Sequence, residues 1–213
     1  MIINFLIIIQ AGNMKIIGIT GGVGAGKTQI LEYLNYKYGA SICQTDAVAK
    51  KFQKKGGKCY DAIVEHFGKE ILNEKEELDR ERLADIVFSD PEELKVLNGI
   101  VHPAVREEID RLIRHEERKN TNLFIIESAL LIEEHYEQVC DEIWYIYVED
   151  SVRRNRLFYS RGYDAKKIDE IIAAQLPKEE FLKNCDRVID NSGVFAETIL
   201  QMDKMVRDLQ ERA

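Results

Sequence analysis

Short apolar runs in this sequence alternate with stretches in which apolar residues recur every three or four positions. Continuous runs are typical of strands that are buried on both faces of a parallel sheet, and the spaced pattern is typical of amphipathic helices. Strands that alternate with helices indicate an α/β fold with a parallel sheet. The predicted strands cover residues 15–20, 40–44, 123–126, 143–148 and 187–191.

A long charged segment separates the second and third predicted strands, and it shows helical stripes without a strand pattern. Proline is favoured in the first turn of a helix, so Asp90-Pro91 predicts one helix start and His102-Pro103 predicts another. His102 then either caps and packs this helix start or contacts a substrate. We expect a core of residues 14–52 and 121–213, interrupted by a helical insertion over residues 53–120.

Two short helices are expected after the fourth predicted strand, with Ser151 and Asp164 as their N-caps. The first helix is dense in arginine, and Arg156 and Arg161 are the strongest candidates among these residues. The arginine side chain suits phosphate oxygens and the charge that develops in phosphoryl transfer. We therefore interpret residues 151–176 as a lid, although a solvated basic helix face would have the same composition.

A glycine-rich stretch joins the first predicted strand to a helical pattern and fits the phosphate-binding loop G-x-x-x-x-G-K-[ST]. Glycine lets the main chain approach a ligand closely, and successive N–H groups then form a cradle for anionic oxygens. Lys27 adds a positive charge for the β- and γ-phosphates, and the Thr28 hydroxyl can ligate Mg²⁺. The predicted nucleotide-binding residues of the loop are Gly22, Val23, Gly24, Ala25, Gly26, Lys27, Thr28 and Gln29.

Polar residues follow or end three of the other predicted strands, at Asp46, Glu127 and Asn191. The carboxyl ends of parallel strands share one edge of the sheet, where ligands bind in open α/β folds. Asp46 can accept a hydroxyl proton or help to hold magnesium through water, and its alternative role is the N-cap of a helix. Glu127 can hold Mg²⁺ through water or accept bonds from backbone N–H groups. We count Asn191 with the nucleotide site and Glu127 with the substrate site.

The composition limits the classes of partner that this chain can bind. The chain has 213 residues and a net charge of −8, which argues against a broad nucleic-acid or membrane-binding surface. The four cysteines are dispersed without a C-x-x-C pair, which argues against zinc and favours free thiols in a reducing cytosol. We expect a cytoplasmic protein, and nothing in the sequence calls for an obligate protein partner.

The first thirteen residues form an apolar segment of doubtful status. The run from Ile2 to Ile9 is too short to span a bilayer, and it lacks the basic region and cleavage site of a signal peptide. Met14 directly precedes the first predicted strand. We expect either that Met14 is the natural start or that residues 1–13 are a dispensable extension. Mass spectrometry that found Met1 or Ile2 at the native N-terminus would remove the first option.

Several segments together resemble the dephospho-CoA kinase family, along nearly the whole chain from Met14. The glycine loop from Gly18 to Thr28 resembles that of the family, and Thr45 to Lys50 resembles its D-x-D-x-I-A-R segment. Weaker likenesses occur further along the chain. They are Asn98 to Pro103 with L-N-x-x-x-H-P, Ala129 to Glu133 with P-L-L-F-E, Ala173 to Gln175 with A-A-Q, and Asp186 to Gly193 with D-x-V-I-x-N-x-G.

This resemblance implies a P-loop kinase core with a five-stranded parallel sheet, a helical substrate domain and a lid. ATP and Mg²⁺ would be the cofactors, and dephospho-CoA would be the acceptor. Asp46 would be the base that receives the proton of the ribose 3′-hydroxyl, and His102 would help to bind the acceptor. Arg156 and Arg161 would belong to a lid that closes on ATP. The chain departs from the family pattern at Gln44, Thr28-Gln29, Ala129 and Ile171, where the family usually has Asp, Ser-Thr, Pro and Arg respectively.

Other functions stay open on these residues. The chain could instead be another kind of small-molecule P-loop kinase, with a nucleoside or nucleotide as acceptor, because such a kinase would have the same loop. A catalytically weak nucleotide-binding module is the alternative that Gln44 and Ile171 suggest. A GTP-dependent switch would be marked by an N-K-x-D motif, and the sequence has none.

Overall fold

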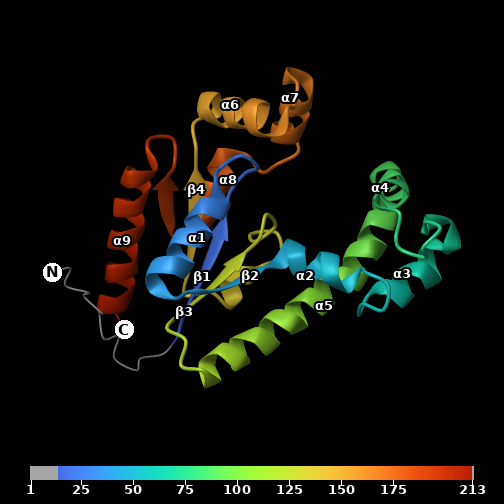
Figure 1. Ribbon diagram of the computed structural model, residues 1–213, viewed down its shortest axis with the longest axis horizontal. Coiled ribbons are helices and arrows are strands. Elements are labelled where there is room, and N and C mark those ends of the chain that lie inside the picture. The colour runs from blue at the N-terminus through green and yellow to red at the C-terminus, as the bar shows by residue number, and fades with distance from the viewer. Residues whose placement is uncertain (1–13, 213) are drawn as a thin grey trace. The chain divides into compact units, whose positions relative to one another are not determined.

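The computed structural model of this chain describes residues 14–212 (Figure 1). The prediction about residues 1–13 lies outside them. Two compact units are present: a sheet unit, which holds residues up to Ile42 and from Glu116 onward, and a helical unit over Cys43–His115. The division into a nucleotide-binding core, a substrate-binding insertion and a lid stays a prediction.

The sheet has five strands in the order β2-β3-β1-β4-β5, and its registered neighbours β1–β3, β1–β4 and β4–β5 pair in parallel. The five-stranded parallel sheet expected from the sequence is confirmed. Its central strand β1 leads into the glycine loop, so the loop leaves the middle of the sheet at its carboxyl edge. The strands are β1 (Lys15–Thr20), β2 (Ser41–Gln44), β3 (Leu123–Glu127), β4 (Glu142–Tyr147) and β5 (Arg187–Asp190).

The main core lies between the sheet and the helices α1 (Lys27–Tyr38) and α9 (Phe195–Glu211). Alternate strand positions such as Ile17, Ile19 and Trp144 are fully buried in this core. Strand residues of one parity point to one face of a sheet, so these side chains all meet the two helices. Burial of each such side chain contributes about 1.5–3 kcal/mol, and this packing anchors the helix that follows the loop.

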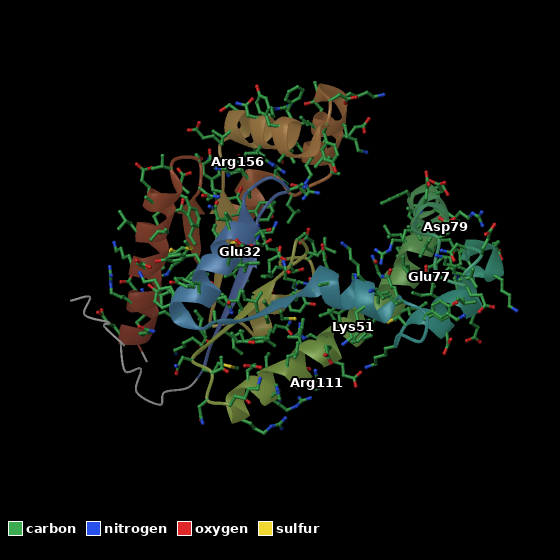
Figure 2. The ribbon with its side chains drawn as sticks, in the orientation of Figure 1. Glu32, Lys51, Glu77, Asp79, Arg111 and Arg156 are labelled. Atoms are coloured by element: carbon green, nitrogen blue, oxygen red, sulfur yellow. The ribbon has the colours of Figure 1, made fainter. Side chains whose placement is uncertain are left out.

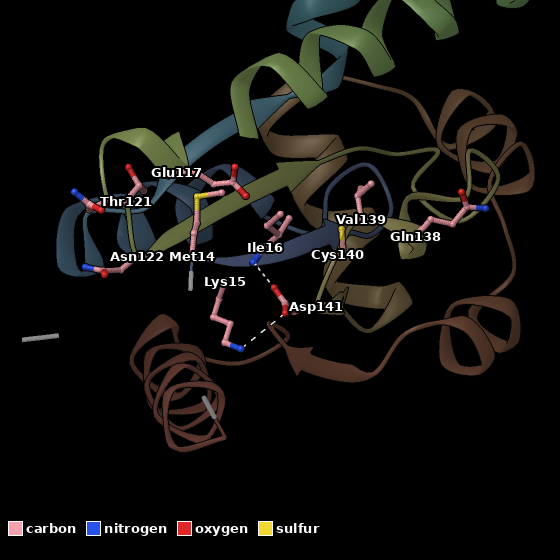
Figure 3. Close-up of a pocket in the computed structure, with 11 residues that line it drawn as sticks. Met14, Lys15, Ile16, Glu117, Thr121, Asn122, Gln138, Val139, Cys140 and Asp141 are labelled. Atoms are coloured by element: carbon pink, nitrogen blue, oxygen red, sulfur yellow. Dashed lines mark hydrogen bonds and ion pairs between the residues drawn. The ribbon is translucent and has the colours of Figure 1, made fainter. Parts of the chain in front are cut away.

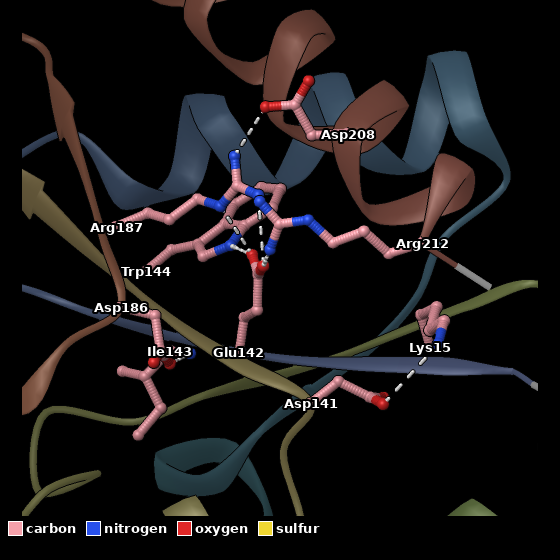
Figure 4. Close-up of polar contacts among 9 residues, drawn as sticks. All are labelled: Lys15, Asp141, Glu142, Ile143, Trp144, Asp186, Arg187, Asp208 and Arg212. Atoms are coloured by element: carbon pink, nitrogen blue, oxygen red, sulfur yellow. Dashed lines mark hydrogen bonds and ion pairs between the residues drawn. The ribbon is translucent and has the colours of Figure 1, made fainter.

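A polar cluster binds the end of α9 to the amino ends of β4 and β5 (Figure 4). The buried Glu142 carboxylate accepts hydrogen bonds from Trp144 Nε1 at 2.9 Å and from Arg212 Nη1 at 3.2 Å. Arg187 Nε lies 2.8 Å from the same carboxylate, and Arg187 Nη1 donates to Asp208 of α9 at 3.0 Å. The cluster lies at the amino edge of the sheet, away from the glycine loop.

The predicted lid contains α6 (Asp150–Arg161) and α7 (Ala165–Ala173), followed by α8 (Lys178–Asn184), which the sequence pattern did not predict. Asp164 caps α7 as expected, since its carboxylate accepts the N–H of Lys167 at 2.7 Å. The expectation that Ser151 caps α6 is wrong. The Glu149 carbonyl accepts the first helical bond, from the Arg153 N–H at 2.9 Å, and the helix therefore begins before Ser151.

In the helical unit, the predicted helix start at His102-Pro103 is also wrong. The helix α5 (Pro91–Arg118) is continuous, with Pro103 inside it. An internal proline costs about 3 kcal/mol, but buried residues continue on both sides of Pro103 at Val101, Ala104 and Ile109. Burial of this continuous face offsets the cost, and the Pro103 position itself is exposed. The other helices of this unit are α2 (Thr45–Phe52), α3 (Tyr60–Phe67) and α4 (Arg80–Ser89).

Within the described residues, none of these helices combines the length and the apolar character that a membrane crossing requires.

Candidate active site

The glycine loop takes a backbone path that side chains would block. Gly24 and Gly26 have φ values of 86° and 84°, in the left-handed region. A Cβ added at Gly21 would lie 2.6 Å from the carbonyl oxygen of Ile146. The helix α1 begins directly after Gly26, without an acidic residue in its first turn. Its N-terminal N–H groups and the positive end of its dipole therefore favour an anion at this place.

Lys27 lies across the base of the loop. Its Nζ donates a hydrogen bond to the carbonyl oxygen of Gly21 at 2.7 Å and lies 3.7 Å from Glu127 Oε1. The pairing of Ile19 with Glu127 in neighbouring strands brings the carboxylate to this edge of the sheet. Both side chains are largely buried, so these two contacts hold the ammonium at the carboxyl edge of the sheet beside Gly21. The structure thus brings Lys27 and Glu127 together, and the sequence did not predict that they pair.

Asn191 supports the loop backbone. Its Nδ2 donates to the carbonyl oxygen of Ala25 at 2.8 Å, and its Oδ1 accepts from the Thr198 hydroxyl at 2.9 Å. The residue is buried, and its amide nitrogen lies only 2.5 Å from where a Cβ of Gly26 would be. The geometry therefore assigns Asn191 a positioning role beneath the loop, and its predicted contact with nucleotide stays a prediction.

The two predicted lid arginines differ in their surroundings. Arg156 Nη2 donates to the carbonyl oxygen of Asn191 at 2.8 Å, and Nη1 lies 3.5 Å from that of Ala25. Figure 2 labels Arg156 between α6 and the amino end of α1. Arg161 is exposed at the end of α6, just before the left-handed Gly162. Of these two arginines, Arg156 therefore lies against the loop in this structure and Arg161 does not.

Two loop contacts were not selected from the sequence. Arg153 Nε donates to the carbonyl oxygen of Val23 at 2.9 Å, and Gln175 Oε1 accepts the Val23 N–H at 3.2 Å. Arg153 Nη2 also donates to Gln175 Oε1. Burial lowers the pKa of Arg153. A three-residue spacing puts Arg153 and Arg156 on one face of α6, and this spacing was the available signal.

Asp46 and His102 belong to the helical unit. Asp46 lies exposed in the first turn of α2, and Gln44 is the residue before the helix. Asp46 is therefore not the N-cap, which removes the alternative role considered for it. His102 is half-buried in the interior of α5, so a capping role at a helix start is also excluded for it. Their substrate roles stay predictions.

A separate hollow of about 630 Å³ lies at the amino edge of the sheet (Figure 3). It is lined mainly by polar residues at the starts of β1, β3 and β4, including Lys15, Asn122 and Asp141. Asp141 accepts the backbone N–H of Ile16 at 2.7 Å. Because phosphate binding depends on the carboxyl edge and the loop, this hollow is not part of the nucleotide site.

Comparison with known proteins agrees with the sequence motifs. A family model described as dephospho-CoA kinase matches residues 15–197. A dephospho-CoA kinase of Streptococcus mutans is 35% identical over 92% of this chain and 98% of its own length.

Two solved structures are similar over nearly their whole length. The Thermus thermophilus protein TT1252 has a TM-score of 0.78 and 28% identity, with 93% of this chain and 99% of that chain covered. A dephospho-CoA kinase from Campylobacter jejuni shares the fold, with a TM-score of 0.60 and 22% identity over 92% of this chain and 98% of its own. From the family match and the Streptococcus mutans relative together, the chain belongs to the dephospho-CoA kinase family.

Proposed function

We propose that this chain transfers the γ-phosphoryl group of ATP to the ribose 3′-hydroxyl of dephospho-CoA, giving coenzyme A and ADP. The family supports this acceptor. The observation that carries the proposal is the glycine loop at the amino end of α1, with Lys27 bonded to the Gly21 carbonyl and Arg156 against Ala25. A loop with these charges supports binding of a polyphosphate and transfer of its terminal group.

The loop residues from Gly22 to Gln29 would hold the phosphates through their N–H groups and the dipole of α1. Lys27 would neutralise charge on the transferred group, since its ammonium is held at the base of the loop. Arg156 would add a second cation from α6. Arg161 is exposed in this structure, so it would reach the nucleotide only if the lid moved toward the loop.

The residues at the loop fit Mg²⁺, which prefers oxygen ligands and keeps several waters when it binds beside phosphates. Thr28 stands in the first turn of α1, and the Glu127 carboxylate lies beside Lys27 at the same edge. We propose that Thr28 ligates the ion and that Glu127 holds it through water. When bound, Mg²⁺ would neutralise charge on the β- and γ-phosphates.

For the acceptor, we propose that Asp46 receives the proton of the 3′-hydroxyl and that His102 and Glu127 contact dephospho-CoA. Exposure of Asp46 in the first turn of α2 is compatible with a carboxylate that meets a substrate. A biosynthetic reaction with small-molecule substrates further supports a cytoplasmic location, with no nucleic acid or membrane as partner.

The test is a coupled assay that measures ADP formed from ATP in the presence of dephospho-CoA. Asp46→Asn keeps the shape of the side chain but removes the proton acceptor, so we expect kcat to fall about 10²–10⁴-fold, the usual contribution of a general base. ATP affinity measured by calorimetry should stay nearly unchanged.

Asp61→Asn is the matched control, because Asp61 is also an exposed carboxylate in the first turn of a helix of the same unit. An unchanged rate for Asp46→Asn would remove Asp46 from its assigned role. A panel of nucleosides and nucleotides tests the acceptor, and turnover with a panel member but not with dephospho-CoA would replace the proposed substrate.

A further inference from the structure

One side-chain oxygen occupies a position on the glycine loop at which an anion would bind. Gln175 Oε1 accepts the backbone N–H of Val23 at 3.2 Å and also accepts from Arg153 Nη2. A backbone N–H of a glycine loop and an arginine fork are the donors that commonly bind a phosphate oxygen. The Gln175 oxygen thus makes the contacts that a nucleotide phosphate would make at Val23.

The space at this position admits one acceptor. A Cβ added to Gly22 would lie 2.4 Å from Arg153 Nη2 and 2.7 Å from Gln175 Oε1, so both side chains are pressed against the loop backbone. Arg153 is fixed there by a second bond, from its Nε to the carbonyl oxygen of Val23 at 2.9 Å. A phosphate oxygen on the Val23 N–H would therefore have to replace the Gln175 oxygen.

Replacement of the Gln175 oxygen by a phosphate oxygen is favourable for the Arg153 guanidinium. A hydrogen bond with an ionised donor or acceptor is roughly twice as strong as one between neutral groups. The bond from Arg153 to the neutral amide of Gln175 has one charged partner, whereas a bond to phosphate would have two. Burial lowers the pKa of Arg153, which means that its charge loses hydration at this place. The amide of Gln175 compensates this loss less well than a phosphate would.

We propose that Arg153 is a further phosphate-binding residue of this enzyme and that the Gln175 amide oxygen occupies the phosphate position until a nucleotide phosphate displaces it. The proposal rests on the proposed function, because ATP is the ligand. Gln175 lies between α7 and α8, so its release would free this connection of the predicted lid as ATP binds. Gln175 is then a positioning residue that competes with ATP.

The test measures the dissociation constants of MgATP and of inorganic tripolyphosphate by calorimetry, without acceptor. Gln175→Ala removes the competing oxygen, and we expect ATP to bind about 2–10-fold more tightly, the net contribution of one typical intramolecular hydrogen bond. Gln175→Glu binds Arg153 more strongly and repels phosphate, so affinity should fall about tenfold or more. Arg153→Gln should weaken binding of both ligands about tenfold or more.

Opposite effects of two substitutions at one position separate this role from a structural one, since damage to the fold would weaken binding in both variants. Gln175→Asn shortens the side chain and should behave like Gln175→Ala. In turnover assays, Gln175→Ala should lower KM for ATP, while kcat changes by less than twofold.

Matched controls change the same charges elsewhere in the sheet unit. Arg154→Gln removes an arginine next to Arg153 on α6, where Arg154 Nη1 pairs with Asp169 at 2.6 Å. Gln210→Glu adds a carboxylate on α9. Both controls should bind ATP as the wild type does.

The proposal is overturned if the Ala and Glu variants at position 175 bind ATP equally, or if both bind it more weakly. If the wild type phosphorylates dephospho-CoA and these variants have unchanged affinities, only the role of Arg153 and Gln175 is lost. If the wild type binds no ATP, the proposed function and this inference fail together.

Discussion

At the scale of single residues, the carbonyl oxygen of Ala25 is one point at which neighbouring side chains hold the loop. It accepts a hydrogen bond from the buried Asn191 amide at 2.8 Å, and Arg156 Nη1 lies 3.5 Å away. These two contacts, together with the hydrogen bond from the Ala25 N–H to the carbonyl oxygen of Gly22 at 3.1 Å, fix the orientation of the loop backbone at Ala25. We therefore expect Asn191 to affect ATP binding through its support of the loop.

We expect Asn191→Ala to raise KM for ATP and to lower the free energy of unfolding by about 1–3 kcal/mol, since it leaves the Ala25 carbonyl and the Thr198 hydroxyl without this partner. Asn191→Asp should raise KM further, because it places a carboxylate oxygen beside a carbonyl oxygen. Urea denaturation and ATP titration measure the two effects.

Asn184→Ala on α8 is the control for Asn191, since the Asn184 amide is exposed and bonds only locally, to Glu180 at 2.8 Å. A KM for ATP that is the same in Asn191→Ala and in the wild type would show that the Ala25 contact does not position the loop.

Residue positions at strand ends could be predicted, while contacts across the lid could not. Glu127 and Asn191 could be placed from the parallel sheet, because the carboxyl ends of its strands share one edge, and Lys27 could be placed from the glycine-loop motif. The contact of Gln175 with Val23 spans 152 positions. The sequence pattern does not indicate which face of α6 contacts the loop. The sequence therefore favours Arg156 and Arg161 and does not identify Arg153.

At the scale of elements, one carboxylate of α9 adds polar contacts with α1 to the apolar packing between the two helices. Asp203 accepts hydrogen bonds from the hydroxyls of Tyr33 and Tyr38 at 2.6 and 2.7 Å, and it pairs with Lys37. Burial alone would raise the pKa of Asp203, but the bonds from Lys37, Tyr33 and Tyr38 hold it below its ordinary value. This cluster keeps the helix that follows the loop in contact with the terminal helix.

A carboxyl whose pKa is lowered in the folded state stabilises the protein above its unfolded pKa, and this contribution is lost as the pH falls through the folded value. We therefore expect Asp203→Asn to lower the free energy of unfolding by about 1–3 kcal/mol at pH 7. The difference from the wild type should shrink below about pH 4, the unfolded pKa of Asp.

Denaturant titrations at pH 7 and at pH 3.5 measure this change. Asp169→Asn is the control, because Asp169 is exposed and pairs only at the surface with Arg154. A deficit of Asp203→Asn that is equal at both pH values would contradict an ionised Asp203 as the source of the stabilisation.

Some helix boundaries could not be predicted from local signals. Pro91 starts α5 as expected, but the second proline of this segment, Pro103, stays inside the helix because buried residues flank it on both sides. The helix α8 has seven residues, and Phe181 is the buried residue among them. One buried position gives no periodic pattern that could be detected in the sequence. Tertiary burial, rather than local propensity, decides both cases.

At the scale of the whole molecule, the proposed ATP site is a loop that joins the central strand to a core helix, so binding of ATP there should stabilise the sheet unit as a body. A ligand at 100 times its dissociation constant adds about 2.7 kcal/mol to the free energy of unfolding. For a chain of this size, that corresponds to a rise in Tm of roughly 5–11 °C.

We expect this rise with MgATP in a thermal melt followed by circular dichroism. Adenosine, which lacks phosphates, should give a much smaller rise, and chelation of the metal by EDTA should reduce the rise with ATP. An equal shift with adenosine and with ATP would mean that the base, rather than the loop and its cations, dominates binding.

Glycine at position 26 is required for two independent reasons: its φ of 84° strains any side chain, and the Asn191 amide fills the place of a Cβ. A smaller residue at position 191 would clear the space, yet it would leave the backbone strained and would release the Ala25 carbonyl. A pair of changes therefore removes the clash but not the backbone strain, and it loses the support of the Ala25 carbonyl. Neither a single substitution at position 26 nor its combination with one at position 191 should therefore be tolerated. Substitutions during divergence should accumulate elsewhere in the chain.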